Sequence, residues 1–113
     1  MKARNQPVSL PAAIAAYWAA ANAGQAVPAA ACFASDAEVQ DENRTHQGRS
    51  EIQAWIEETT RKYQPQVEPL QARETGAGWT VVARVTGRFP GSPIELDFGF
   101  TLAGDRIAKL QIS

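Results

Sequence analysis

One carboxylate in this chain is placed where apolar side chains point. Residues 33–41 read Phe-Ala-Ser-Asp-Ala-Glu-Val-Gln-Asp, and the alternation of a strand puts Asp41 on the same face as Ala37 and Val39. Burial disfavours the charged form of an acid, so such a carboxylate either accepts hydrogen bonds or holds its proton more tightly. The pattern therefore predicts a general base at a strand end; the alternative is an Asp turned toward solvent.

Aromatic side chains supply a candidate pocket. Tyr17 and Trp18 share the inward face of a predicted helix, and Trp55 has the same placement on a later one. The two indole rings suit a planar apolar ligand, and they suit a hydrophobic core equally well. The Tyr17 hydroxyl either lines a pocket or meets a backbone partner. Trp18, Trp55, Phe33 and Val39 are the predicted ligand contacts.

The chain has few other groups that could do chemistry. His46 is the only histidine, and one His beside two acids does not define a metal site, so we expect an exposed loop histidine. The sequence contains no glycine-rich phosphate loop, no Cys-x-x-Cys and no Ser/His/Asp set. It therefore predicts neither a metal nor an organic cofactor.

Length and charge exclude several classes. A chain of 113 residues predicts a single domain over residues 1–113. Its 11 basic and 12 acidic residues form no basic stripe, so a nucleic-acid partner is disfavoured. The single cysteine, Cys32, cannot form an internal disulfide, which predicts a reducing, cytoplasmic location.

The N-terminus imitates a secretory signal. Lys2 and Arg4 precede the apolar run of residues 12–21. Because Pro11 suits a helix start and Trp18 is bulky for a signal core, we interpret the run as a helix of the mature protein. No run reaches the roughly eighteen apolar residues that span a bilayer, so no membrane partner is expected.

The hydrophobic pattern predicts helices first and strands afterwards. We expect helices over residues 9–23, a short helix starting at Pro28 and running to Phe33, and a third from Ser50, with a Ser50/Gln53 capping box, to Pro65. A strand over residues 37–41 is followed by a polar loop over residues 42–48, and the remaining strands are expected over residues 66–74, 79–88, 94–102 and 106–112. This order is typical of an α+β fold.

Residues 94–102 carry two distinct rows. Ile94, Leu96 and Phe98 begin an apolar row, and Glu95 and Asp97 begin a polar one. If helices cover one sheet face, a second apolar surface suggests sheet-to-sheet dimerisation, although alternation does not say which row faces which way.

These elements resemble the nuclear transport factor 2-like superfamily, which includes SnoaL-like polyketide cyclases and ketosteroid isomerases. The resemblance is carried by residues 17–24 (Tyr-Trp-Ala-Ala-Ala-Asn-Ala-Gly), residues 33–41, Gly48 with Ile52 and Trp55, and residues 100–107. It implies a cone-shaped α+β barrel, with three N-terminal helices packed on a curved, mainly antiparallel sheet that encloses a pocket. It also implies a homodimer through the sheet, and it covers enzymes as well as binding modules.

The resemblance to the ketosteroid isomerases extends to particular residues. Tyr17 and Asp41 match their oxyanion donor and their base, and Asp97 matches their protonated acid when the chain is aligned from the closing hairpin. Two positions depart from the pattern: Ile56 replaces a supporting Tyr, and Glu42 replaces the Pro after the base.

Two functions follow from the residues and the resemblance. The first is a cofactor-independent isomerase or cyclase that abstracts a proton from an apolar carbonyl compound, with Tyr17, Asp41 and Asp97 as catalytic residues. The alternative is a non-catalytic module that binds a hydrophobic ligand or dimerises.

Overall fold

The computed structural model describes residues 8–76 and 78–113, and these form three helices and six strands. The elements in chain order are α1 (Ala12–Asn22), α2 (Ala26–Ala30), β1 (Phe33–Asp41), β2 (Arg44–Gln47), α3 (Arg49–Tyr63), β3 (Gln66–Thr75), β4 (Gly78–Thr86), β5 (Ile94–Ala103) and β6 (Arg106–Ile112). The expected α+β layout is confirmed.

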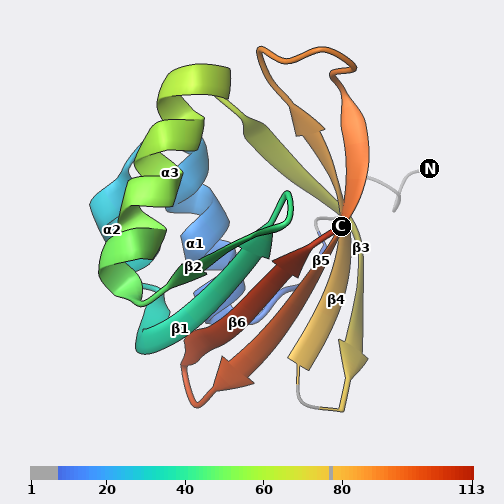
Figure 1. Ribbon diagram of the computed structural model, residues 1–113. Coiled ribbons are helices and arrows are strands. Elements are labelled where there is room, and N and C mark those ends of the chain that lie inside the picture. The colour runs from blue at the N-terminus through green and yellow to red at the C-terminus, as the bar shows by residue number, and fades with distance from the viewer. Residues whose placement is uncertain (1–7, 77) are drawn as a thin grey trace, which may run out of the picture.

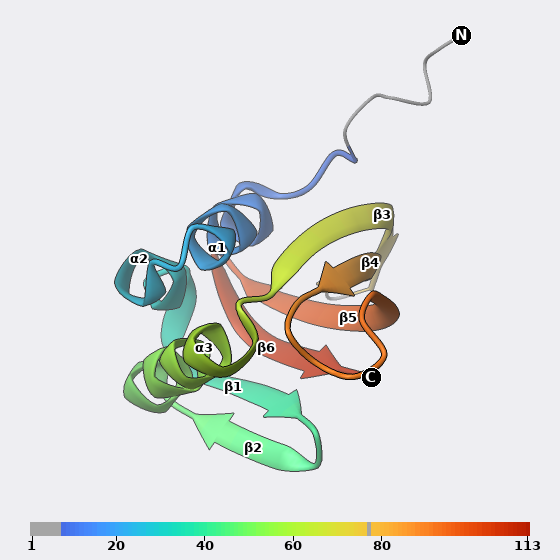
Figure 2. The same cartoon turned by 90° about the horizontal axis from the view of Figure 1, so that it is seen from above.

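All six strands form one sheet in the order β2-β1-β6-β5-β4-β3. β1 and β6 pair in parallel, and the other neighbours pair antiparallel. The helices gather on one side of this sheet (Figure 1). Seen from above, the sheet curls, so that β3 lies beside α1 at one end while β1 and β2 lie beside α3 at the other (Figure 2). This is the cone that the family resemblance implied.

The first helix is stabilised by its alanines and by one buried face. Ala has the highest helix propensity, and Ile14, Tyr17 and Trp18, at helical spacing, are the buried residues of α1. Gly24 follows the helix with a φ of +73°, a left-handed conformation that glycine adopts without a Cβ clash. No described helix has both the length and the apolarity to cross a membrane. Lys2 and Arg4 lie outside the described residues.

The predicted polar loop over residues 42–48 is wrong. Residues 44–47 form β2, which pairs antiparallel with β1 from Glu38↔Gln47 to Asp41↔Arg44. The two residues between the strands, Glu42 and Asn43, have φ of 54° and 63°, as a tight type I′ hairpin requires. β2 lies at the sheet edge and buries one residue, His46, so its sequence carries no apolar alternation.

The helix boundaries also differ from the prediction: α1 begins at Ala12 rather than Ser9, and α2 begins at Ala26 rather than Pro28. The short second helix ends at Ala30, and Phe33 already belongs to β1. The third helix begins after Gly48, with no side-chain capping bond from its N-cap. In place of the predicted Ser50/Gln53 box, the backbone N–H of Gln47 donates to Glu51 Oε1 at 2.7 Å. The carboxylate thus meets a backbone donor at the helix start, where negative charge is stabilising.

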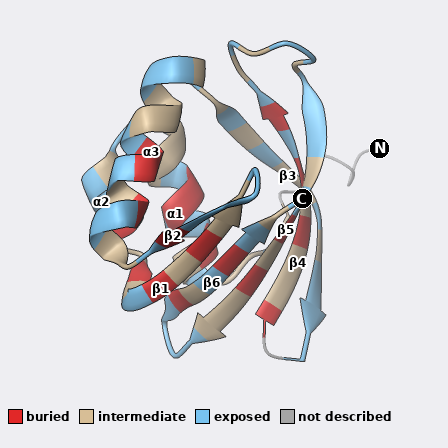
Figure 3. Ribbon diagram, viewed as in Figure 1, coloured by how far each residue is buried: buried red, intermediate tan, exposed pale blue. Residues whose placement is uncertain are grey.

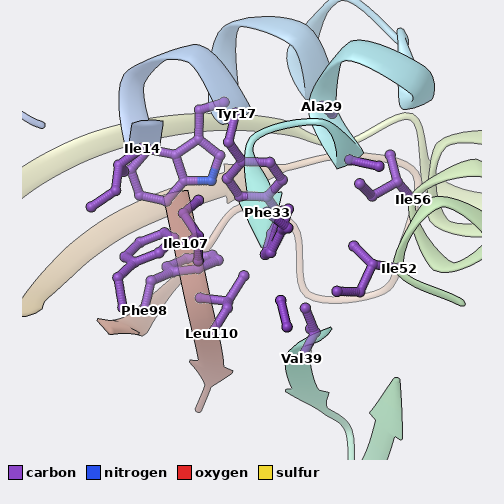
Figure 4. Packing of buried hydrophobic residues seen from close by; sticks show 14 of the residues in the cluster. Ile14, Tyr17, Ala29, Phe33, Val39, Ile52, Ile56, Phe98, Ile107 and Leu110 are labelled. Carbon is purple, nitrogen blue, oxygen red and sulfur yellow. The ribbon is translucent and has the colours of Figure 1, made fainter. Parts of the chain in front are cut away.

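The core lies between the helices and the concave face of the sheet. Buried residues follow the inner faces of the strands and helices (Figure 3). Figure 4 shows Ile52 and Ile56 of α3 directed toward the same interior as Phe33, Val39 and Leu110 of the sheet. Large-to-small substitutions in such a core cost about 2–5 kcal/mol each.

The structure decides which row of β5 faces inward. Phe98 and Phe100 are buried, and Leu96 is half-buried against the core. Glu95 and Asp97 are exposed on the opposite face. The apolar row of β5 therefore faces the interior of the same chain. Homodimerisation through the sheet and a cytoplasmic location stay predictions.

Candidate active site

A cavity of about 590 Å³ opens between the helices and the curled sheet. This volume lies within the range of small-molecule sites. Its wall is lined by Tyr17, Trp18, Ala21, Asn22, Asp41, Glu42, Trp55, Ile56, Thr59, Thr60, Tyr63, Pro65, Val67, Val85, Phe89, Pro90, Ile94, Leu96, Phe98, Ile112 and Ser113. The lining is mainly apolar, with a few polar side chains among it, as expected of a site for an apolar molecule.

Tyr17 is held in this wall by aromatic neighbours. Its side chain is 5% exposed, and its ring meets Phe33 edge-on at 5.1 Å and Phe100 at 6.3 Å between centroids. Burial raises the pKa of its hydroxyl, and the negative charge of Asp41 raises that pKa further. Tyr17 therefore stays protonated at neutral pH and can donate a hydrogen bond into the cavity.

Asp41 ends the inward row of β1 and is partly buried. Its Oδ2 accepts a hydrogen bond of 3.2 Å from the indole N–H of Trp55. Burial raises the pKa of Asp41 above its usual value; the hydrogen bond from Trp55 opposes this shift, and the charge of Glu42 adds to it. The carboxylate accordingly has a higher proton affinity than an exposed Asp, as a general base requires.

The two groups together support one kind of chemistry. Both line the same cavity, and the charge of Asp41 is felt at the Tyr17 hydroxyl. A carboxylate that accepts a proton and a neutral phenol that stabilises a developing oxyanion are the two parts needed to form an enolate.

The predicted ligand contacts divide into cavity and core. Trp18 and Trp55 line the cavity. Phe33 and Val39 do not: both are fully buried in the core, and Figure 4 shows them below Tyr17 and Ile56. Phe33 and Val39 thus lie in the core, and of the inward row of β1 only Asp41 is among the residues that line the cavity.

Asp97 is not brought to the site. It is exposed on the outer face of β5, next to the cavity-lining residues Leu96 and Phe98. The alignment from the closing hairpin selected Asp97 but did not show which face of β5 its side chain occupies. Neighbouring residues of a strand point to opposite faces of the sheet, so an alignment shifted by one residue selects a side chain on the wrong face. The structure therefore does not bring Asp97 to the cavity that Tyr17 and Asp41 line.

The departures from the isomerase pattern lie at the cavity. Ile56 lines it with an apolar side chain and offers no hydroxyl, and Glu42 lies at its exposed rim. Asn22, which the sequence interpretation missed, is already occupied: its amide donates to the Val67 carbonyl at 3.0 Å, and its Oδ1 accepts from the Val67 N–H at 2.9 Å. Thr59 and Tyr63 were also missed, although both follow Trp55 and Ile56 at helical spacing on α3.

His46 is buried rather than exposed. Its side chain is 8% exposed, and its ring stacks on Trp55 at 5.7 Å between centroids with an interplanar angle of 29°. It lines a second, polar pocket of about 20 Å³, roughly the volume of one water. Within residues 8–76 and 78–113, no three His, Cys, Asp or Glu side chains lie close enough to hold a metal ion.

The fold and the pocket define the class to which this protein belongs. Three helices on a curved, mostly antiparallel six-stranded sheet make the nuclear transport factor 2-like cone. Within that class, the family model described as a SnoaL-like domain matches residues 14–110. The chain therefore belongs to the SnoaL-like family.

Several solved structures are similar to this chain. A candidate polyketide cyclase from Sinorhizobium meliloti is 36% identical, with a TM-score of 0.88 and coverage of 92% of this chain and 95% of that chain. A protein from Sphaerobacter thermophilus is 28% identical, with a TM-score of 0.66 and coverage of 93% and 96%. A Catenulispora acidiphila protein with a ketosteroid isomerase-like fold, solved with trimethylamine, is 22% identical, with a TM-score of 0.82 and coverage of 93% and 86%, and shows the fold alone. No curated protein matches the chain.

Proposed function

We propose that this protein catalyses cofactor-independent proton transfer on an apolar carbonyl compound, as an isomerase or cyclase. The observation that carries the proposal is that Tyr17 and Asp41 line one cavity of about 590 Å³. Asp41 takes a proton from the carbon next to the carbonyl, and the electron pair of that C–H bond moves to the carbonyl oxygen. Tyr17 donates a hydrogen bond to the resulting enolate.

The enolate then has two possible fates. In an isomerisation, protonated Asp41 returns its proton to another carbon of the same molecule, so that a double bond moves. In a cyclisation, the enolate carbon attacks a second carbonyl of the same molecule, the π electrons of that carbonyl move to its oxygen, and the proton held by Asp41 is returned to the alkoxide that forms. The similarity to a candidate polyketide cyclase supports the second fate.

The donor set restricts the substrate. With Asp97 exposed on the outer sheet face and Asn22 bonded to Val67, Tyr17 is the donor that we assign to the enolate oxygen. One donor stabilises an oxyanion less than two. The proposal therefore favours a ketone whose adjacent C–H is already acidified by a second carbonyl or a conjugated double bond.

A second candidate function is non-catalytic binding of an apolar molecule in the same cavity. The observation that favours it is the position of Asp97, because the second oxyanion donor of the isomerase pattern is missing from the cavity wall. The two candidates differ in whether Asp41 interacts with the reactive part of the ligand.

A thermal-shift titration with planar phenols, which mimic an enolate, tests the proposal. Phenols acidic enough to be ionised where Asp41 titrates, such as nitrophenols, are repelled by the ionised Asp41 carboxylate, so their binding to the wild type should change with pH as Asp41 titrates, and Asp41→Asn should flatten that dependence. Binding that is equally pH-independent in both proteins would favour the binding module. Absence of a shift with any phenol would overturn the proposed function.

A further inference from the structure

Trp55 contacts Asp41 in a way that its role as a pocket aromatic does not explain. The indole N–H donates to Oδ2 of the carboxylate at 3.2 Å. An ionised carboxylate has two oxygens, and each can accept more than one hydrogen bond. A donor fixed on one oxygen restricts rotation of the carboxylate and leaves the other oxygen for a proton of the substrate.

The indole ring of Trp55 is itself held in place by packing contacts. Trp55 is buried in α3, and His46 of β2 stacks on it at 5.7 Å. Trp55 also forms part of the wall of both the large cavity and the small polar pocket. A ring packed in this way keeps one orientation, and so does the N–H that it carries.

We propose that Trp55 is a positioning residue, which holds Asp41 by Oδ2 and presents Oδ1 to the substrate. The inference rests on the proposed function, because Trp55 is assigned the role of orienting Asp41 as the catalytic base. The hydrogen bond also stabilises the ionised carboxylate, so Trp55 keeps the base available at a lower pH than burial alone would allow.

Several charged groups surround this pair. Glu42 of the hairpin turn and Arg44 and His46 of β2 act on the Asp41 charge, and Tyr17 faces it from α1. Glu58 and Lys62 of α3 line the small pocket beside it. Trp55→Phe replaces none of these residues and keeps an aromatic ring on which His46 can stack, and the effect of a smaller ring in the cavity wall is measured by a second variant.

The chain offers a matched control. Trp18 lines the same cavity, is 4% exposed, and carries an indole Nε1 that is buried without a hydrogen-bond partner in the described part of the chain. Trp55→Phe and Trp18→Phe therefore each remove one indole from the cavity wall. Only the first removes a hydrogen bond to Asp41.

The titration of Asp41, followed by ¹³C NMR of its carboxyl carbon, tests the proposal without a substrate. We expect an upward shift of its midpoint in Trp55→Phe and no shift in Trp18→Phe. In the wild type, the Trp55 indole resonance should move with the same midpoint, and this movement should be lost in Asp41→Asn. That second measurement needs no Trp55 variant and so survives if Trp55→Phe fails to fold.

The outcomes separate the inference from the proposed function. Equal midpoints in both Trp variants, or a Trp55 resonance indifferent to Asp41, would overturn the positioning role. If the wild type abstracts protons from a ketone, Trp55→Phe should lower kcat by up to about a hundredfold with KM little changed. A wild type that abstracts no protons would refute the proposed function while the NMR result still decided whether Trp55 controls Asp41.

Discussion

Tyr17 of α1 and Asp41 of β1 face one cavity, and the charge of Asp41 raises the pKa of the Tyr17 hydroxyl. The charge of Asp41 thus favours the protonated phenol that an oxyanion donor needs, and burial separately raises the pKa of Asp41 itself. Helix α1 and strand β1 thus each place one of the two side chains in the wall of the same cavity.

Removal of the Tyr17 hydroxyl should affect turnover far more than folding. Tyr17→Phe keeps the ring contacts to Phe33 and Phe100, so we expect stability to change by less than about 1.5 kcal/mol. Loss of one oxyanion donor should lower kcat roughly 10²–10³-fold. Tyr63→Phe, a second tyrosine of the cavity wall, is the control and should retain activity. Equal losses in both variants would contradict the assignment.

Asp41 makes the stability of the protein pH-dependent. Its pKa is higher in the folded protein than in the unfolded chain, so the folded state binds more protons between the two values, and stability falls as pH rises through them. Asp41→Asn removes this penalty. We expect its thermal midpoint to exceed that of the wild type at pH 7, and the difference to shrink below about pH 3. If Asp41→Asn were more stable than the wild type at pH 3 but not at pH 7, the pKa of Asp41 would be lowered rather than raised by folding.

Asn22 joins the end of α1 to the start of β3. Its side chain satisfies both backbone groups of Val67, at 3.0 Å and 2.9 Å, and Val67 lines the cavity. Asn22→Ala leaves a partly buried donor and acceptor without these partners, so we expect a loss of about 1–3 kcal/mol in chemical denaturation. Gln53→Ala, which removes only an exposed bond to Glu57, should cost less than about 0.5 kcal/mol. Similar losses of stability in Asn22→Ala and Gln53→Ala would contradict the stabilising role assigned to the Asn22–Val67 hydrogen bonds.

Asp97 should contribute little to the site. It is exposed on the outer face of β5, so Asp97→Asn should change stability by less than about 0.5 kcal/mol and leave the pH dependence of phenol binding unchanged. A change in that dependence as large as the one from Asp41→Asn would return Asp97 to the catalytic set.

Periodicity was sufficient to predict most of the fold. The spacing of Ile14, Tyr17 and Trp18 predicted the buried face of α1, and the strand β6 was predicted with its observed bounds. Alternation also placed Asp41 correctly on the inward row of β1. These properties depend on local repeat patterns, which a single sequence displays directly.

The errors arise where tertiary placement decides. Strand β2 is polar because it is an edge strand with one buried residue, His46. Alternation placed Val39 on the same face as Asp41, but it did not show that the core ends and the cavity begins between these two residues. The contact between Trp55 and Asp41 joins a helix to a strand end, and no spacing rule predicts it.

The most direct test of the central claim is exchange of the hydrogen next to a carbonyl, because it needs no knowledge of the product. Planar apolar ketones, including 1,3-diketones, would be incubated in D₂O with the wild type or Asp41→Asn and followed by proton NMR. The account predicts that the wild type accelerates deuterium incorporation beside the carbonyl, and that Asp41→Asn reduces this by at least about a hundredfold while still binding the ketone. Equal incorporation by the two proteins would contradict the assignment of Asp41 as the base.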